Sequence, residues 1–135
     1  MRVLIADDSA LVREKLSAAL SEIEGLEIVG QTPDAQIVVE FVRTLSPEVV
    51  LMDIRLRGGN GIDALRTIKQ GAHAPLVLVF TNYTHAEYRE KCRDAGADFF
   101  FAKSSEFKAM LATLRVFLTR PRYTSANARK WRCSK

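Results

Sequence analysis

The chain has 135 residues, of which 47% are hydrophobic and 27% charged, so its size and composition suit a single globular domain with a full-sized core. Its formal net charge is +4, but the six basic residues of segment 119–135 stand there without acids, which leaves residues 1–118 at −2. No apolar run approaches the roughly 18 residues that a membrane-spanning helix needs, and the two cysteines show neither disulfide-framework nor zinc-site spacing, so we expect a cytoplasmic protein that does not contact a membrane.

Five short hydrophobic runs alternate with segments of helical periodicity, which is typical of an α/β fold. The runs are continuous rather than alternating, as strands are when helices cover both faces of a parallel sheet. We therefore predict strands at 3–6, 28–30, 49–52, 76–80 and 99–102.

The segments between these runs carry apolar residues at helical spacing. Pro47 blocks extension of the second segment, and Gly96 favours the end of the fourth. We predict helices at 9–24, 34–45, 62–69, 85–95 and 104–118. With right-handed crossovers these units form a doubly wound (βα)5 domain over 1–118, a flavodoxin-like parallel sheet in the order 2-1-3-4-5. Segment 119–135 has low hydrophobicity and is interpreted as a basic, flexible tail.

Polar side chains follow the predicted strands at the point where each strand ends. Asp7 and Asp8 follow the first strand, and Asp53 follows the third. Thr81 and Lys103 follow the fourth and the fifth. Because the carboxyl ends of parallel strands share one rim, we expect these residues to form one pocket. Three carboxylates, a hydroxyl and an ammonium there suit a divalent cation and a phosphoryl group.

These residues, together with the sequence at 53–61, resemble the receiver domains of two-component response regulators over residues 1–118. The resemblance implies that Asp53 is the phosphoacceptor for a sensor histidine kinase or a phosphotransfer protein. It also implies a site for Mg²⁺ or Mn²⁺ formed by Asp7, Asp8, Asp53 and the backbone carbonyl of Arg55, in which Asp7 would act mostly through water. Lys103 would then contact a phosphoryl oxygen, and Thr81 would donate its hydroxyl. Such a protein is a signalling switch that modifies itself and is not an enzyme acting on a metabolite.

The resemblance further implies how the signal leaves the pocket. Thr81 and Phe100 match the switch positions of the family, and the readout surface would comprise 85–95, 99–102 and 104–118. A downstream protein is expected to bind that surface, with a homodimer as an open alternative. Arg55, Asn82 and Tyr83 are expected near the opening, where they would tune the lifetime of the phosphoryl group. Because few residues follow 118, a stand-alone receiver without a DNA-binding domain is expected.

Three positions depart from the family pattern. Arg57 replaces a frequent proline, which we expect to loosen the loop after Asp53. Ser104 replaces another, and Asn82 occupies a position where a small residue is common.

Other interpretations of the same residues stay open. Asp8 or Ser9 could simply cap a helix, and Asp53 could be a turn residue. The basic tail, with its two aromatic residues, could contact nucleic acid, although we do not expect that. Phosphohydrolases with an aspartate nucleophile share the α/β sheet and Mg²⁺ but place the nucleophile after the first strand. A receiver that works without phosphorylation is a further alternative. Cys92 fits the apolar stripe of its helix and is interpreted as a packing residue.

Overall fold

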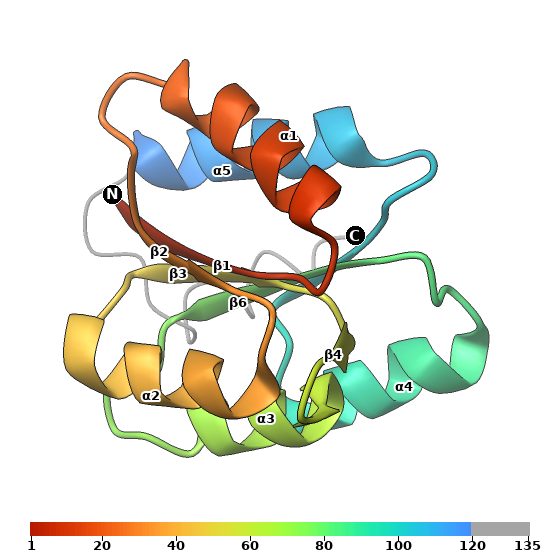
Figure 1. Cartoon of the computed structure of the whole chain (residues 1–135). Helices are drawn as coiled ribbons and strands as arrows, with labels where there is room; N and C mark the ends of the chain where they lie inside the picture. The colour runs from red at the N-terminus through yellow and green to blue at the C-terminus, as the bar shows by residue number, and fades with distance from the viewer. Residues whose placement is uncertain (120–135) are drawn as a thin grey trace.

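Five parallel strands form the central sheet of the computed structural model, which describes residues 1–119 (Figure 1). The strands lie in the order β2-β1-β3-β6-β7, which confirms the predicted topology. Their bounds are β1 (Arg2–Ala6), β2 (Glu27–Thr32), β3 (Val49–Met52), β6 (Leu76–Thr81) and β7 (Phe99–Ala102). The three central strands are almost entirely buried, which explains their continuous apolar sequences. Apart from Thr119, the predicted tail 119–135 lies outside the described residues.

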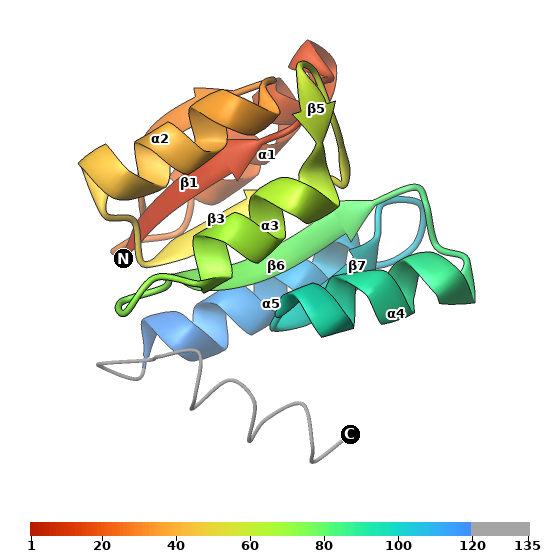
Figure 2. The same cartoon turned by 90° about the horizontal axis from the view of Figure 1, so that it is seen from below.

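Helices cover both faces of this sheet. Helices α1 (Ala10–Ser21) and α5 (Phe107–Leu118) lie on one face, and α2 (Ala35–Leu45), α3 (Gly61–Lys69) and α4 (Ala86–Ala95) lie on the other (Figures 1 and 2). The core accordingly has two halves. One contains Leu16 and Leu20 of α1 with Leu114 of α5, and the other contains Leu65 of α3 with Cys92 of α4. None of the helices within residues 1–119 has the length and hydropathy needed to cross a lipid bilayer.

Several element boundaries differ from the sequence prediction. Helix α1 stops at Ser21, and a turn containing Gly25 at φ 89° leads into β2, which is longer than predicted. Helix α5 begins at Phe107 rather than 104, because the preceding residues form a turn. In that turn Glu106 forms two hydrogen bonds with Ala102. The Glu106 N–H donates to the Ala102 carbonyl (2.9 Å), and the Glu106 side chain accepts from the Ala102 N–H (2.9 Å).

A two-stranded hairpin that the sequence did not predict follows Asp53. Strands β4 (Arg55–Leu56) and β5 (Gly59–Asn60) pair antiparallel around Gly58, whose φ of 72° favours glycine. The hairpin is tied to the start of α2, since the Arg57 N–H donates to the carbonyl of Pro33 (2.8 Å) and the Ala35 N–H donates to that of Arg57 (2.8 Å). A proline at 57 has no N–H for the first bond. The Arg57 N–H thus ties the loop to the start of α2, and the expectation that Arg57 loosens the loop stays a prediction.

Candidate functional site

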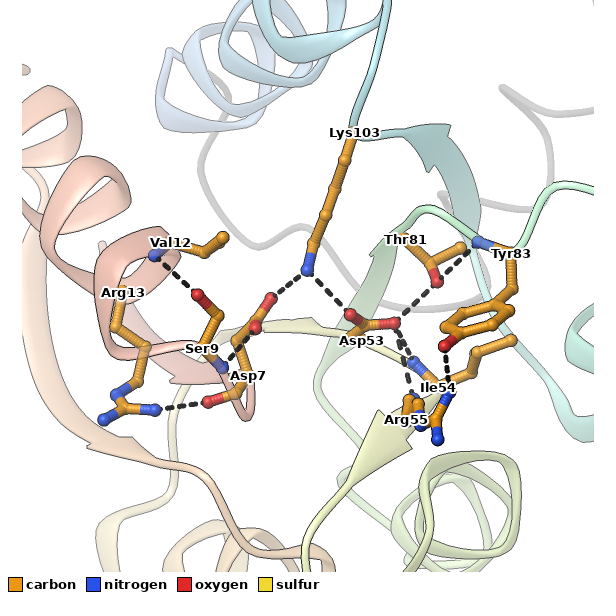
Figure 3. Close-up of polar contacts among 10 residues, drawn as sticks. All are labelled: Asp7, Ser9, Val12, Arg13, Asp53, Ile54, Arg55, Thr81, Tyr83 and Lys103. Carbon is orange, nitrogen blue, oxygen red and sulfur yellow. Dashed lines mark hydrogen bonds and ion pairs between the residues drawn. The ribbon is translucent and has the colours of Figure 1, made fainter.

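Four of the predicted site residues converge at the carboxyl edge of the sheet (Figure 3). Asp7 directly follows β1, Asp53 follows β3, Thr81 ends β6 and Lys103 follows β7. Backbone hydrogen bonds continue past the strand ends: the Asp53 N–H donates to Ala6 and the Lys103 N–H donates to Thr81. The parallel register thus fixes side chains from four strands at one place.

Lys103 joins two of the carboxylates. Its Nζ lies 2.6 Å from Oδ2 of Asp7 and 2.7 Å from Oδ2 of Asp53. All three side chains are largely buried, so water weakens these ion pairs little. Burial alone would lower the pKa of the Lys103 ammonium, but its hydrogen bonds to Asp53 and Asp7 outweigh burial and raise that pKa. The ammonium is therefore a fixed positive charge beside Asp53.

The other oxygen of Asp53 accepts hydrogen bonds from neutral donors. The hydroxyl of Thr81, which is fully buried, donates to Oδ1 over 2.6 Å. The backbone N–H of Ile54 donates to the same oxygen over 2.7 Å. Asp53 is thus held in one orientation by Lys103 on one oxygen and by these donors on the other, which is suitable positioning for a nucleophile.

Residues at the start of α1 position Asp7. The Ser9 N–H donates to Oδ1 of Asp7 (2.9 Å), and the Arg13 guanidinium donates to the Asp7 carbonyl (2.5 Å). The Ser9 hydroxyl accepts from the Val12 N–H (3.2 Å), so Ser9 is the residue that caps the helix. The sequence analysis missed this supporting role of Arg13. Its position one helical turn beyond Ser9 was the signal that could have indicated it.

Asp7, Asp8 and Asp53 form an acidic cluster whose oxygens fit a divalent cation. One carboxylate oxygen from each residue lies within 4.8 Å of the others. Burial, and to a smaller extent the charge of Asp53, raise the pKa of Asp7 against the opposing effect of Lys103. Three carboxylates face a single ammonium, so negative charge is in excess. Hard oxygen ligands of this kind suit Mg²⁺ or Mn²⁺.

Arg55 and Tyr83 lie together beside this cluster. The Arg55 guanidinium donates to the Tyr83 hydroxyl and lies 5.7 Å from the centre of the Tyr83 ring. The Tyr83 N–H donates to the Thr81 hydroxyl oxygen (3.1 Å), so the pair is connected to the interior of the site. Asn82, between Thr81 and Tyr83, is exposed.

Phe100, the predicted switch residue, contacts α4. It is half-buried on β7, and the Arg89 guanidinium of α4 lies 4.5 Å from the centre of its ring. No pattern in the sequence indicated this contact with Arg89. Cys92 is fully buried, and burial followed by the charge of Asp53 raises the pKa of its thiol to about 11, which supports its interpretation as a packing residue.

Comparisons with known proteins agree with this geometry. The family model of the response regulator receiver domain matches residues 3–115. Transcriptional regulatory protein PdtaR of Mycobacterium tuberculosis is 37% identical over 125 residues, which are 93% of this chain and 60% of that protein. The chain thus matches these curated relatives over most of its own length but spans only about three fifths of theirs.

Solved structures show the same fold. A two-component response regulator of the LuxR family from Aurantimonas sp. SI85-9A1 superposes with a TM-score of 0.80 at 28% identity, covering 99% of this chain and 98% of that one. The response regulator domain of Thermotoga maritima CheB gives a TM-score of 0.75 at 29% identity, covering 87% of this chain and 92% of that one.

Proposed function

Because the chain belongs to the family of response regulator receiver domains, we propose that Asp53 accepts a phosphoryl group from a phosphohistidine donor and that the domain then signals to a protein partner. The donor would be a sensor histidine kinase or a phosphotransfer protein. One observation carries the proposal: the Asp53 carboxylate is held between the Lys103 ammonium and the Thr81 hydroxyl at the carboxyl edge of the sheet. The domain changes its own covalent state and is not proposed to convert a metabolite.

In the transfer step, a carboxylate oxygen of Asp53 attacks the phosphorus of the donor. The new P–O bond forms as the P–N bond to the donor's histidine breaks, and the imidazole leaves. Both reactants are anionic, so positive charge near Asp53 lowers the barrier. Lys103 supplies one such charge and remains available to a phosphoryl oxygen. A Mg²⁺ or Mn²⁺ ion held by Asp7, Asp8, Asp53 and the Arg55 carbonyl would supply further charge neutralisation.

The change of state is proposed to leave the site through Thr81. Its hydroxyl now donates to Asp53 and can donate to a phosphoryl oxygen after the transfer. Phe100 on β7 is proposed to move in response, which would alter the surface formed by α4, β7 and α5. That surface is the proposed binding site for a downstream protein, or for a second copy of this chain.

The residues at the mouth of the site are proposed to set how long the phosphoryl group persists. Hydrolysis requires a water molecule to approach the phosphorus, and we propose that Arg55, Asn82 and Tyr83 line that approach. The contact of Arg55 with Tyr83 supports this role, because it places two large side chains together beside Asp53.

The first experiment treats the chain with acetyl phosphate, with and without Mg²⁺, and measures intact mass. Wild type is expected to gain one phosphoryl group in a Mg²⁺-dependent manner, and Asp53→Asn is expected to gain none. Asp63→Asn is the matched control, because this aspartate is exposed on α3 and belongs to no part of the site. Its adduct should equal that of wild type.

Two results would contradict the proposal. One is an adduct that survives in Asp53→Asn, and the other is the absence of any adduct in a folded wild-type chain. The same assay tests the mouth residues, since Arg55→Ala is expected to shorten the lifetime of the adduct once acetyl phosphate is removed. An unchanged lifetime would show that Arg55 does not shield the phosphoryl group.

A further inference from the structure

A groove opens between the β4–β5 hairpin and the facing sides of α3 and α4, next to the phosphoacceptor site. Figure 2 shows α3 and α4 side by side on the same face of the sheet. The charged and aromatic residues that line the groove are Arg55, Asp63, Arg66, Tyr83, Tyr88 and Lys91. The groove uses α4 together with α3 and the hairpin, whereas the surface proposed above for output uses α4 together with β7 and α5.

The charge of the groove is opposite to that of the domain. Three cations line it, whereas residues 1–118 carry a formal charge of −2. Asp63, an acid in the lining, is already paired with Arg66 over 2.9 Å, and this exposed pair leaves further guanidinium donors available. Within residues 1–118, such a local reversal of charge directs an anionic segment to the groove, because the cations attract it there and the acidic remainder of these residues repels it.

The apolar part of the groove favours a peptide as that partner. Buried Ile54 and Ile62 contribute to the lining, as do the half-buried rings of Tyr83 and Tyr88, which pack edge to face with centres 5.9 Å apart. Aromatic residues of this kind commonly anchor an apolar side chain of a bound protein segment. Cations around an aromatic surface therefore match an acidic segment with an apolar residue in its middle.

One wall of the groove is connected to Asp53 by hydrogen bonds. The Thr81 hydroxyl donates to Asp53 (2.6 Å) and accepts from the Tyr83 N–H (3.1 Å), and the Tyr83 hydroxyl accepts from Arg55. If the Thr81 hydroxyl turns toward a phosphoryl group, its bond to the Tyr83 N–H must adjust. Tyr83 and Arg55 then move together, and with them one side of the groove.

We infer that this groove binds an acidic, apolar-centred segment of a partner protein, and that the state of Asp53 changes the affinity. The second part rests on the proposed function, whereas the first part does not. The inference adds a second partner surface to the domain, with its own chemical preference.

The test uses a defined probe on the full chain. The probe is a short synthetic peptide of glutamates and aspartates around one leucine and one tryptophan, and its counterpart carries lysines in place of the acids. Binding is followed by amide chemical shifts in NMR spectra, with and without Mg²⁺ and beryllofluoride as a stable mimic of the phosphoryl group. We expect the acidic peptide to shift amides of the groove, and the lysine peptide not to bind.

Charge reversal locates the site. Arg66→Glu combined with Lys91→Glu should weaken binding about tenfold or more, because both residues are expected to contact the acids of the probe. Lys108→Glu reverses one charge in the same way at an exposed position on α5, and it should leave binding unchanged. Three results would each contradict binding in the groove: equal binding of the two peptides, shifts confined to β7 and α5, or no effect of the double charge reversal.

The two parts of the inference fail separately. If wild type forms the phosphoryl adduct but its peptide affinity is the same with and without beryllofluoride, the coupling to Asp53 is overturned. If no adduct forms, the proposed function fails. Peptide binding to the groove is then tested by the affinity of the untreated chain alone.

Discussion

At the scale of single residues, the burial of the Asp7 carboxylate works against folding. Burial raises its pKa above the ordinary value, and the nearby charge of Asp53 adds to this, although Lys103 and the Ser9 N–H act in the opposite direction. A carboxyl whose pKa is higher in the folded state binds its proton more tightly there than in the unfolded chain. The stability that Asp7 contributes is therefore lost as the pH rises through the raised pKa.

From this sign we predict that Asp7→Asn stabilises the metal-free protein. At pH 7 the free energy of unfolding should rise, on the order of 1 kcal/mol, because the amide avoids the burial of a charge while Lys103 keeps Asp53 as its partner. The difference should shrink as the pH falls below the raised pKa, where wild-type Asp7 is itself neutral. Urea unfolding in the presence of a chelator, repeated across pH, measures both effects.

Asp63→Asn is the matched control for that measurement. Its carboxylate is exposed and forms only a surface pair with Arg66, so the expected change is within about 0.5 kcal/mol. A lower stability of Asp7→Asn at pH 7 would show that the ion pair of Asp7 with Lys103 outweighs the burial of its charge.

At the scale of elements, a buried ion pair fastens α3 to the amino ends of β6 and β7. Lys69, at the end of α3, places its Nζ 2.7 Å from Oδ2 of Asp98 and 2.9 Å from the carbonyl of Pro75. The same carboxylate oxygen accepts from the Val77 N–H over 2.8 Å. Both side chains are buried, so water cannot readily replace either partner of the ion pair.

We predict that Lys69→Met lowers the free energy of unfolding by about 3–5 kcal/mol, because it leaves the Asp98 carboxylate buried without its cation. Chemical denaturation of the two proteins provides the comparison. Arg66→Met on the exposed side of the same helix should change stability by no more than about 0.5 kcal/mol. A loss for Lys69→Met as small as that of the control would mean that water or a rearranged neighbour replaces the ammonium.

The strands of the main sheet were predictable from sequence because each is an unbroken apolar run in a domain with helices on both faces. The β4–β5 hairpin was not, since each strand has only two residues and its bonds to Pro33 and Ala35 come from a distant part of the chain. The start of α5 was displaced for a similar reason, because the bonds between Glu106 and Ala102 form a turn that helical periodicity does not reveal.

The site was predictable to the extent that the topology determines it. Residues that directly follow parallel strands must share one edge, so the convergence of Asp7, Asp53, Thr81 and Lys103 could be inferred from the sequence. Contacts that depend on the path of long side chains could not. The pairing of Arg55 with Tyr83 is one such contact, as is the cation over the ring of Phe100.

At the scale of the whole molecule, the fold gathers three carboxylates at one edge of a domain that is already negatively charged. In the unfolded chain, Asp53 lies more than forty positions from Asp7 and Asp8, so no comparable cation site exists there. A ligand that binds only the folded state stabilises it by an amount set by its concentration relative to its dissociation constant. The cluster should therefore make the stability of the whole domain depend on divalent cations.

We predict that Mg²⁺ raises the unfolding temperature of wild type progressively, by an amount equivalent to about 2.7 kcal/mol at a hundredfold excess over the dissociation constant. Sodium chloride at matched ionic strength should not reproduce the rise, because screening acts on all exposed charges alike. Asp8→Asn should remove most of the effect, since it deletes a carboxylate of the cluster at a position that is only half-buried, where the substitution itself disturbs little packing. Thermal unfolding followed by circular dichroism tests this directly. A rise of equal size in Asp8→Asn would place the bound cation elsewhere, and no rise in wild type would mean that the folded cluster does not bind Mg²⁺.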